Sequence, residues 1–421
     1  MFFYFFIIIQ LKGVILLKST VLKNGLTIVS HEDDNSKVCT LAYLIKSGSY
    51  DELDNERGIA HLVEHVLFKG TLNRDYKQIN NDIESIGGLL NAETNFEYTK
   101  YYCTVPFDKW DIGLDVLSDM IFNHTIPEEE FLKEKKVVQE ELTMYNDDPE
   151  SYICDQLIKN MFINYPNRQS VGATVDDIEK ITRNDVLDFI NRNYYPENMI
   201  IVSTGNIKHE NIVSFIEKYI NKLNIDFTSY QKSYKQFTEK GNIQQLIKFE
   251  RENVGQTHLA FGLFGPSYHS EDSIPVDLLS VILGENSSSI LFDTIREQKG
   301  LAYTIHLSNE VLDDVSLILG YAGLNKSSNI IDEITNIIEN INDYLNEDKL
   351  NAAKAYLIGM LYLSVEKTSG MNRFLSDSLL HNDTDTINIL CDKINKVTLE
   401  DIQNVANKYF TKDNIYFAKL N

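Results

Sequence analysis

The stretch from Gly58 to Phe68 reads GIAHLVEHVLF, and it combines an apolar pattern of helical period with three polar side chains. His61 and His65 stand four residues apart, so on a helix they share one face, about one turn apart. Glu64 lies three residues after His61, on the flank of that face. The remaining positions are apolar, which indicates a buried helix, and polar groups on a buried helix need partners.

A metal ion is the partner that this spacing favours. Two imidazoles four residues apart can both reach one tetrahedral Zn²⁺ at about 2.0–2.1 Å. Glu64 would then lie beside a metal-bound water without ligating the metal. The alternative is that two core histidines and a glutamate bond to ordinary neighbours. Because the chain has nine histidines in 421 residues, a pair at ligand spacing favours the metal.

A catalytic zinc usually takes three protein ligands and a water, so a third ligand is expected from another buried helix. The segment 127–145 is the candidate, with Pro127 suited to a first turn and an apolar stripe after it. Glu134 and Glu141 are seven residues apart on one face, which suits Glu141 as ligand and Glu134 as acceptor of an imidazole N–H. Acidic residues on helices usually face solvent, and the spacing ranks Glu141 only slightly above Glu140.

Outward from this centre, periods of two and of 3.6 residues alternate along the first half of the chain. Asn24-Gly25 predicts a hairpin turn between two strands. The other expected elements are strands at 39–47, 98–105 and 199–204, and helices at 56–68, 76–85, 109–122, 127–145, 151–162 and, as two short runs, within 176–191.

The second half repeats the plan at a separation of about 200 residues. Strands are expected at 256–263, 303–307 and 315–322, and helices at 274–283, 290–298, 331–346 and 350–366. We therefore expect an α+β protein of two similar domains, each an antiparallel-rich mixed sheet packed with helices. The expected ranges are a metal-binding domain at 19–220, a polar linker at 221–245 and a second domain at 246–421.

The formal charge of −23 argues against nucleic-acid binding, and no basic cluster offsets it. Such a charge either steers basic peptides toward a chamber or simply keeps a solvated surface soluble. The four cysteines are widely spaced without a C-x-x-C pair, which is typical of a reducing compartment.

Residues 1–18 form an apolar extension that begins MFFYFFIII and lacks a basic n-region and a cleavage site. It is short for a membrane span, since Gln10, Lys12 and Gly13 interrupt it. An anchor or unusual signal, a buried first strand, and translated sequence upstream of the true start are the three interpretations. We favour the last for residues 1 to 13. Nothing else in the sequence predicts a membrane span, so membrane association is not expected.

The inverted order His-x-x-Glu-His resembles the motif of the pitrilysin (insulinase-like) family of zinc peptidases. The similarity extends over nearly the whole chain from about residue 22, and the chain resembles the short two-domain type, such as the mitochondrial processing peptidase β subunit and its bacterial relatives. The stretches that carry it are HLVEHVLFKGT (61–71), GGLLNAETNFEYTKYY (87–102), VVQEELTMYNDDPE (137–150), YYPENMIIVSTGN (194–206) and SSSILFDTIREQKGLAY (287–303).

The resemblance implies a zinc-dependent endopeptidase with one Zn²⁺ per chain. It assigns the metal to His61, His65 and Glu141, with Glu134 as the supporting carboxylate and Glu64 as the general base. It further implies that Arg296 and Tyr303 contact the substrate and stabilise the tetrahedral intermediate. The substrate is expected to add as an extended strand along Asn91, Ala92, Glu93 and Thr94.

Full-length relatives place the metal and the Arg/Tyr pair in opposite halves of a clamshell, and this chain corresponds to half of one. We therefore expect a homodimer whose composite site joins the metal residues of one chain to Arg296 and Tyr303 of its partner. Peptides, including basic ones, are the expected substrates. The cytoplasm is expected for a bacterial chain and the mitochondrial matrix for a eukaryotic one. The competing hypothesis is a catalytically silent scaffold subunit of a larger complex.

Overall fold

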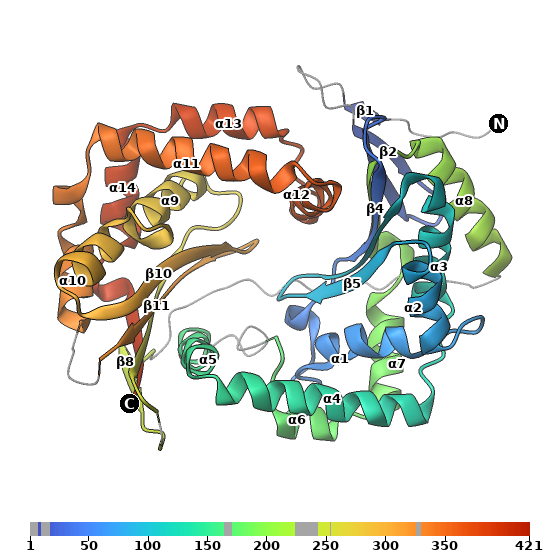
Figure 1. Ribbon diagram of the computed structural model, residues 1–421, viewed down its shortest axis with the longest axis horizontal. Coiled ribbons are helices and arrows are strands. Elements are labelled where there is room, and N and C mark those ends of the chain that lie inside the picture. Colours follow the sequence, from blue (N-terminus) through green and yellow to red (C-terminus); the bar gives the residue numbers. More distant parts are fainter. Residues whose placement is uncertain (1–6, 10–16, 164–170, 224–242, 253, 326–329) are drawn as a thin grey trace. The chain divides into compact units, whose positions relative to one another are not determined.

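The computed structural model describes residues 7–9, 17–163, 171–223, 243–252, 254–325 and 330–421, which form two compact units (Figure 1). Unit 1 comprises Met1–Leu142, Ser170–Ser233 and Leu363–Thr386, and unit 2 comprises Thr143–Gln169, Tyr234–Tyr362 and Ile387–Asn421. The expected ranges 19–220 and 246–421 thus supply most of units 1 and 2, while 143–169 and 363–386 belong to the opposite unit. The extension 1–18 and the linker 221–245 lie largely outside the described residues. No helix in the described part of the chain is both long and apolar enough to cross a bilayer.

Unit 1 contains a seven-stranded sheet in the order β1-β2-β3-β7-β4-β6-β5. The hairpin predicted at Asn24-Gly25 is present, since β2 and β3 pair antiparallel from Val21↔Thr27 outward and Gly25 has a φ of 87°. All pairs are antiparallel except β3 with β7. The strands are β1 (Ile7–Ile9), β2 (Leu17–Val21), β3 (Thr27–Glu32), β4 (Val38–Ile45), β5 (Leu89–Thr94), β6 (Thr99–Pro106) and β7 (Met199–Gly205).

The helices of unit 1 cover both faces of this sheet. On one face, residues of α1, α3 and α7 share a single core with the strands. On the other face α12 packs against β4 and β7, where buried Asn372 donates to the carbonyl of Val202 at 2.9 Å. The helices are α1 (Ile59–Val66), α2 (Tyr76–Glu84), α3 (Trp110–Phe122), α4 (Glu128–Asp147), α6 (Val175–Lys180), α7 (Arg183–Asn193), α8 (His209–Leu223) and α12 (Thr368–Leu380).

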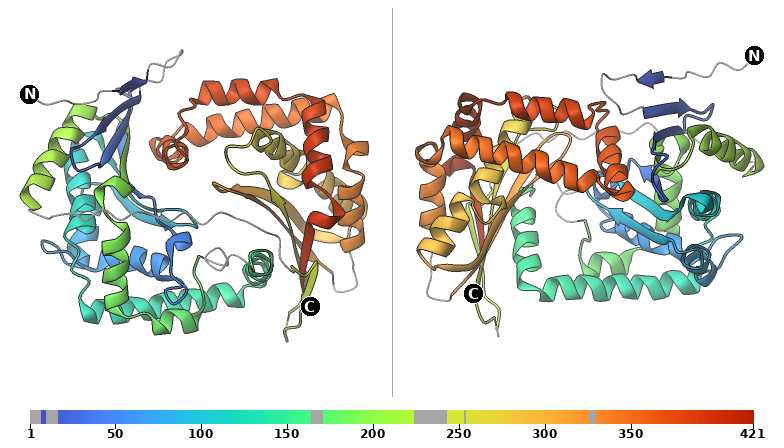
Figure 2. Two further views of the ribbon diagram at one scale, coloured as in Figure 1. Left: turned by 180° about the vertical axis from the view of Figure 1, so that it is seen from behind. Right: turned by 45° about the horizontal axis from the view of Figure 1, so that its top comes forward.

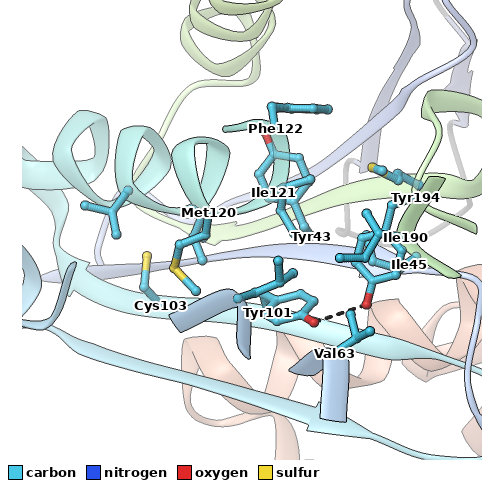
Figure 3. Packing of buried hydrophobic residues seen from close by; sticks show 14 of the residues in the cluster. Tyr43, Ile45, Val63, Tyr101, Cys103, Met120, Ile121, Phe122, Ile190 and Tyr194 are labelled. Carbon is cyan, nitrogen blue, oxygen red and sulfur yellow. Dashed lines mark hydrogen bonds between the residues drawn. The ribbon is translucent and has the colours of Figure 1, made fainter. Parts of the chain in front are cut away.

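Three tyrosines are built into the unit 1 core with their hydroxyls paired (Figure 3). Tyr101 and Tyr194 place their hydroxyl oxygens 3.1 Å apart, and Tyr43 bonds to the Ser118 hydroxyl at 2.8 Å. Because a buried hydroxyl without a partner is costly, these pairs let large rings fill the core beneath α1. The core therefore fixes α1 against the sheet.

Unit 2 contains a five-stranded sheet in the order β10-β11-β9-β12-β8. In Figure 2 the orange-to-red helices at 331–365 and 387–409 gather on one side of this sheet, and their apolar residues contribute to its core. The strands are β8 (Leu246–Phe249), β9 (Thr257–Gly265), β10 (Ala302–Val311), β11 (Ser316–Leu324) and β12 (Ile415–Leu420). The helices are α5 (Pro149–Met161), α9 (Ser273–Ser280), α10 (Ile331–Glu339), α11 (Glu347–Val365), α13 (Ile387–Lys396) and α14 (Leu399–Tyr409).

The two sheets share one topology, which confirms the prediction of two α+β domains of similar plan. The order β5-β6-β4-β7-β3 corresponds to β10-β11-β9-β12-β8, and the inner parallel pair β3/β7 corresponds to β8/β12. The second face of each sheet is covered by a helix from the other half of the sequence. Helix α12 packs on β4 and β7, and α5 packs on β9 and β12.

The structure differs from the sequence prediction mainly in the second half. The residues expected as helix at 290–298 form a π-helix at Phe292–Gln298, and α9 also ends in a π-turn at Val281–Glu285. The helix expected at 331–346 is α10 followed by a 3-10 turn at Ile341–Tyr344. Helices α8, α12, α13 and α14 and strands β8 and β12 were not predicted.

Candidate metal centre

Helix α1 is anchored at its N-terminus by a buried carboxylate. Glu52 accepts hydrogen bonds from the backbone N–H groups of Gly58 at 2.9 Å and Ala60 at 3.0 Å. These donors lack intrahelical partners at a helix start, so the side chain of Glu52 acts as the cap. Gly58 has a φ of 82°, and a Cβ there would lie 2.7 Å from Ile178 Cδ1, so glycine is required. The start of α1 is therefore fixed independently of its polar face.

The predicted metal residues converge in unit 1. His61 Nε2 and His65 Nε2 are 3.2 Å apart, and the two rings meet edge to face at 86°. Glu141, from α4, places Oε2 at 3.4 Å from His65 Nε2 and 4.0 Å from His61 Nε2. In the described part of the chain, this is the one group of histidine, cysteine and acidic side chains that is spaced to hold a metal ion. Glu140 is exposed on α4, and it is not part of this group.

These three side chains fit a zinc ion. Ligands at about 2.0–2.1 Å around a tetrahedral ion stand about 3.3–3.4 Å apart, and the three observed separations bracket that value. Two imidazoles and one carboxylate are also a ligand set used by catalytic zinc. Burial, followed by the nearby charge of His65, lowers the pKa of His61 to about 4, so its ring is neutral at pH 7 as ligation requires.

Glu134 lies behind the ring of His65, as the sequence predicted. Its Oε1 lies 3.0 Å from His65 Nδ1, and its Oε2 pairs with Lys69 Nζ at 2.7 Å. Burial alone would raise the pKa of Glu134, but the bonds from His65 and Lys69 hold it below its usual value. An ionised acceptor at Nδ1 keeps a proton on that nitrogen, so Nε2 is the nitrogen of His65 that can bind a metal ion.

Glu64 stands on the flank of the cluster and is held by the edge strand. The hydroxyl of Thr94 on β5 donates to Glu64 Oε2 at 2.5 Å. Burial raises the pKa of Glu64, although this hydrogen bond and the charge of His65 act in the opposite direction. Glu64 therefore has one carboxylate oxygen fixed by Thr94 and a pKa raised above its usual value, and both features suit proton transfer.

The remaining predicted residues occupy two places. Asn91 to Thr94 lie on β5, the terminal strand of the unit 1 sheet, whose outer edge has no strand partner among the described residues. Arg296 and Tyr303 belong to unit 2. The Arg296 guanidinium lies 4.5 Å from the centre of the Phe292 ring and 3.7 Å from Glu297 Oε1. Tyr303 is 77 % exposed at a register shift between Ala302 and Thr304.

Three contributions to this centre were missed in the sequence. Lys69 stands four residues after His65, so helical spacing was an available signal for its contact with Glu134. Thr94 was predicted only as part of the substrate strand, whereas its hydroxyl holds Glu64. Nothing in the sequence pattern links Glu52 to the start of α1, because the intervening loop determines that contact.

Comparisons with known proteins agree with this architecture. The insulinase model (Peptidase family M16) matches residues 27–175, and the M16 inactive-domain model matches residues 180–357. The uncharacterized zinc protease YmxG of Bacillus subtilis is 30 % identical over 94 % of this chain and 97 % of its own length. An uncharacterized zinc protease of Rickettsia felis is 30 % identical over 93 % of this chain and 94 % of its own.

Solved structures give the same result. A protease from Helicobacter pylori superimposes with a TM-score of 0.90 at 25 % identity, covering 97 % of this chain and 100 % of that one. An M16-like peptidase from Alicyclobacillus acidocaldarius, at 18 % identity, shares the fold with a TM-score of 0.83 over 98 % of this chain and 99 % of its own. The chain belongs to the insulinase family, Peptidase family M16, also called the pitrilysin family.

Proposed function

We propose that this protein is a zinc-dependent endopeptidase that binds one Zn²⁺ per chain through His61, His65 and Glu141. The observation that carries the proposal is the convergence of two imidazole nitrogens and one carboxylate oxygen at ligand spacing. The name zinc protease, given to relatives that match over nearly their whole length, supports the same activity.

The chain's own residues supply the proton transfers. When bound, the zinc acidifies a water and polarises the scissile carbonyl. Glu64 accepts the proton of the attacking water and delivers it to the leaving amine. Thr94 keeps one oxygen of Glu64 occupied, so the other oxygen is the one available to the water. Glu134 and Lys69 hold the ring of His65 throughout.

The substrate binds along β5 in this proposal. The outer edge of the strand, which has no strand partner among the described residues, offers backbone groups to an extended peptide that would pair with Asn91, Ala92 and Glu93. Backbone pairing gives affinity with little demand on sequence, so short or unfolded peptides are the expected substrates. Since Thr94 on this strand contacts Glu64, a peptide paired with β5 runs beside the general base.

The test is hydrolysis of a quenched fluorescent peptide before chelation, after chelation and after zinc is added back. Activity should disappear with the chelator and return with zinc, and the Glu64→Gln chain should be at least 100-fold slower. A correctly folded protein that binds no zinc and cuts no peptide would instead support a scaffold role.

We also propose that Arg296 and Tyr303 complete the site of a partner chain in a homodimer. Tyr303 is exposed at an irregularity of β10 instead of packed in the core, and such irregularities often re-aim side chains near active sites. A Glu64→Gln chain mixed with a Tyr303→Phe chain should regain part of the activity. Proven mixed dimers without any recovery would contradict the shared site.

The range of peptides that are cut would distinguish a presequence-processing peptidase from a scavenging one. A presequence-processing peptidase should cut one bond in a basic amphipathic peptide, whereas a scavenging peptidase should cut many unrelated peptides at several bonds. Mass spectrometry of the products from a mixed peptide panel distinguishes the two.

A further inference from the structure

Helix α12 and strands β5 and β6 enclose a hollow of about 550 Å³ within unit 1. Its charged lining consists of Glu93 on β5, Lys100 on β6, and Arg373 and Asp377 on α12. Because successive side chains of a strand point to opposite faces, Lys100 faces away from Tyr101, which packs in the core with α1. The hollow therefore opens on the sheet face opposite to the candidate metal centre.

The charges around the hollow are unevenly placed. The Lys100 side chain is 3 % exposed, with Nζ 3.8 Å from Glu93 Oε1, and the Tyr98 hydroxyl donates to the same oxygen at 3.3 Å. Arg373 is exposed, and it makes no ion pair within 4 Å of any residue that the structure describes. Glu93 is thus paired with the buried amine of Lys100, whereas Asp377 has no ion pair within 4 Å in the described part of the chain and is attracted by Arg373 and Lys100 at longer range.

Burial is the main cause of the pKa shifts of the charged groups around the hollow. Burial raises the pKa of Asp377 to about 6, although Arg373 and Lys100 act against the rise. Burial also lowers the pKa of Lys100, despite the attraction of Glu93 and Asp377. A cation entering the hollow would favour the ionised form of Asp377 and disfavour the protonated form of Lys100.

The strand geometry connects the hollow to a bound peptide. Asn91 pairs with Tyr102 and Glu93 with Lys100, so these four side chains share the face of the hollow. Thr94 points the other way, toward Glu64 on α1. A peptide paired with β5 would present every second side chain to the hollow, and the alternate side chains to the metal centre.

We propose that this hollow is a specificity pocket that receives a lysine or arginine side chain from alternate positions of an extended substrate. The proposal rests on the proposed function, because it takes the peptide to lie along β5. The entering cation pairs with Asp377 and Glu93, and the solvent-facing Arg373 moves aside. An acidic side chain would reach the same two carboxylates and meet repulsion, so it is disfavoured.

A peptide series tests this directly with the zinc-loaded protein. One quenched peptide is varied at each position in turn among lysine, norleucine and glutamate, where norleucine keeps the length of lysine without its charge. Lysine should raise kcat/KM over norleucine about tenfold at positions two residues apart, and have little effect at the positions between them. Glutamate should lower it at the same alternate positions.

Two substitutions separate local pairing from long-range attraction. Asp377→Asn should reduce the lysine-to-norleucine ratio from about tenfold to about one. Asp108→Asn removes the same charge from an exposed site of unit 1 outside the hollow, and should leave the ratio unchanged. Arg373→Gln should keep or increase the ratio. Thermal unfolding of each variant shows whether the fold is intact.

The outcomes separate the pocket from the catalytic proposal. If hydrolysis depends on zinc but lysine is not preferred at every second peptide position, the pocket proposal fails and the peptidase proposal stands. The same holds if glutamate is preferred and Arg373→Gln removes that preference. If the wild type cuts nothing, the peptidase proposal fails. The pocket is then tested by fluorescence anisotropy of the same peptides on the Glu64→Gln chain, where equal Kd values for lysine and norleucine overturn it.

Discussion

The two units share a sheet topology, yet they place different chemistry at equivalent points. After β4, unit 1 continues to α1, where His61, Glu64 and His65 interrupt an apolar helix. After β9, unit 2 continues to α9 (SIPVDLLS), whose one ionisable residue is Asp277. The strands and their order are the same, so the sheet does not dictate a metal site. A few polar residues on one helix, together with carboxylates from α4, make the difference.

The largest expected effect comes from substituting Glu141, the carboxylate that lies beside His61 and His65. Glu141→Ala should weaken zinc binding more than about 100-fold and abolish peptide hydrolysis, because it removes the only carboxylate oxygen in the described ligand group. Glu140→Ala is the matched control on the exposed side of the same helix. Zinc titration with a competing chelator measures both, and equal effects of the two substitutions would contradict the assignment.

A smaller effect is expected at the carboxylate that supports His65. Glu134→Gln should weaken zinc binding by about 10- to 100-fold, since the ring loses the ionised acceptor that fixes its tautomer. Glu129→Gln, at an 82 % exposed position five residues earlier, should leave the affinity within about twofold. Unchanged affinity in the Glu134→Gln chain would mean that the contact with Nδ1 does not orient the ligand.

The cap of α1 should affect stability more than it affects chemistry. Glu52→Gln replaces one accepting oxygen with a donor that faces one of the two backbone N–H groups, so the free energy of unfolding should fall by about 1–3 kcal/mol. Asp54→Asn, at a nearby exposed position, should change it by less than about 0.5 kcal/mol. Denaturant titration measures both variants. If Glu52→Gln lowers the free energy of unfolding no more than Asp54→Asn does, Glu52 does not stabilise the start of α1.

The smallest effect concerns the carboxyl group of Asp277 in unit 2. Burial raises the pKa of Asp277 to about 6, although Asn309 donates a hydrogen bond to it at 2.7 Å. Between the unfolded value near 4 and about 6, the native state binds more protons, so the free energy of unfolding falls as pH rises through this window. The fall should be on the order of 1–2 kcal/mol.

Asp277→Asn should remove this part of the pH dependence, because the amide cannot ionise. The difference in unfolding free energy between variant and wild type should therefore grow in favour of the variant from pH 4 to pH 7. Denaturant titrations at several pH values measure it, and parallel pH curves for the two proteins would exclude ionisation of Asp277 as the cause.

The elements that the sequence predicted well are those whose apolar residues follow one period. The strands at 39–47 and 98–105 and the helix at 56–68 were found because one face of each is apolar. Helix α12 was missed because it turns Asn372, Ser376 and Ser378 toward buried surroundings, where side-chain hydrogen bonds replace apolar contacts. The π-helical segments of unit 2 were predicted as ordinary helix, because the sequence pattern does not distinguish a π-turn from an α-helix.

The candidate site was predictable to the extent that it lies on helices. The spacings within α1 and α4 brought His61, His65, Glu134 and Glu141 together in the prediction. The spacing ranked Glu141 only slightly above Glu140, and the family resemblance selected Glu141, which the structure places beside the two histidines. The contacts of Glu52 and Thr94 come from a loop and an edge strand, whose positions depend on the whole fold.

The most direct test of the account is a zinc titration of the metal-free protein, with bound zinc and peptide hydrolysis measured in the same samples. Activity should rise in proportion to bound zinc and reach its maximum at one ion per chain. The Glu64→Gln chain should bind the same single ion and stay at least 100-fold less active. Hydrolysis by metal-free protein, or full activity in the Glu64→Gln chain, would contradict the account.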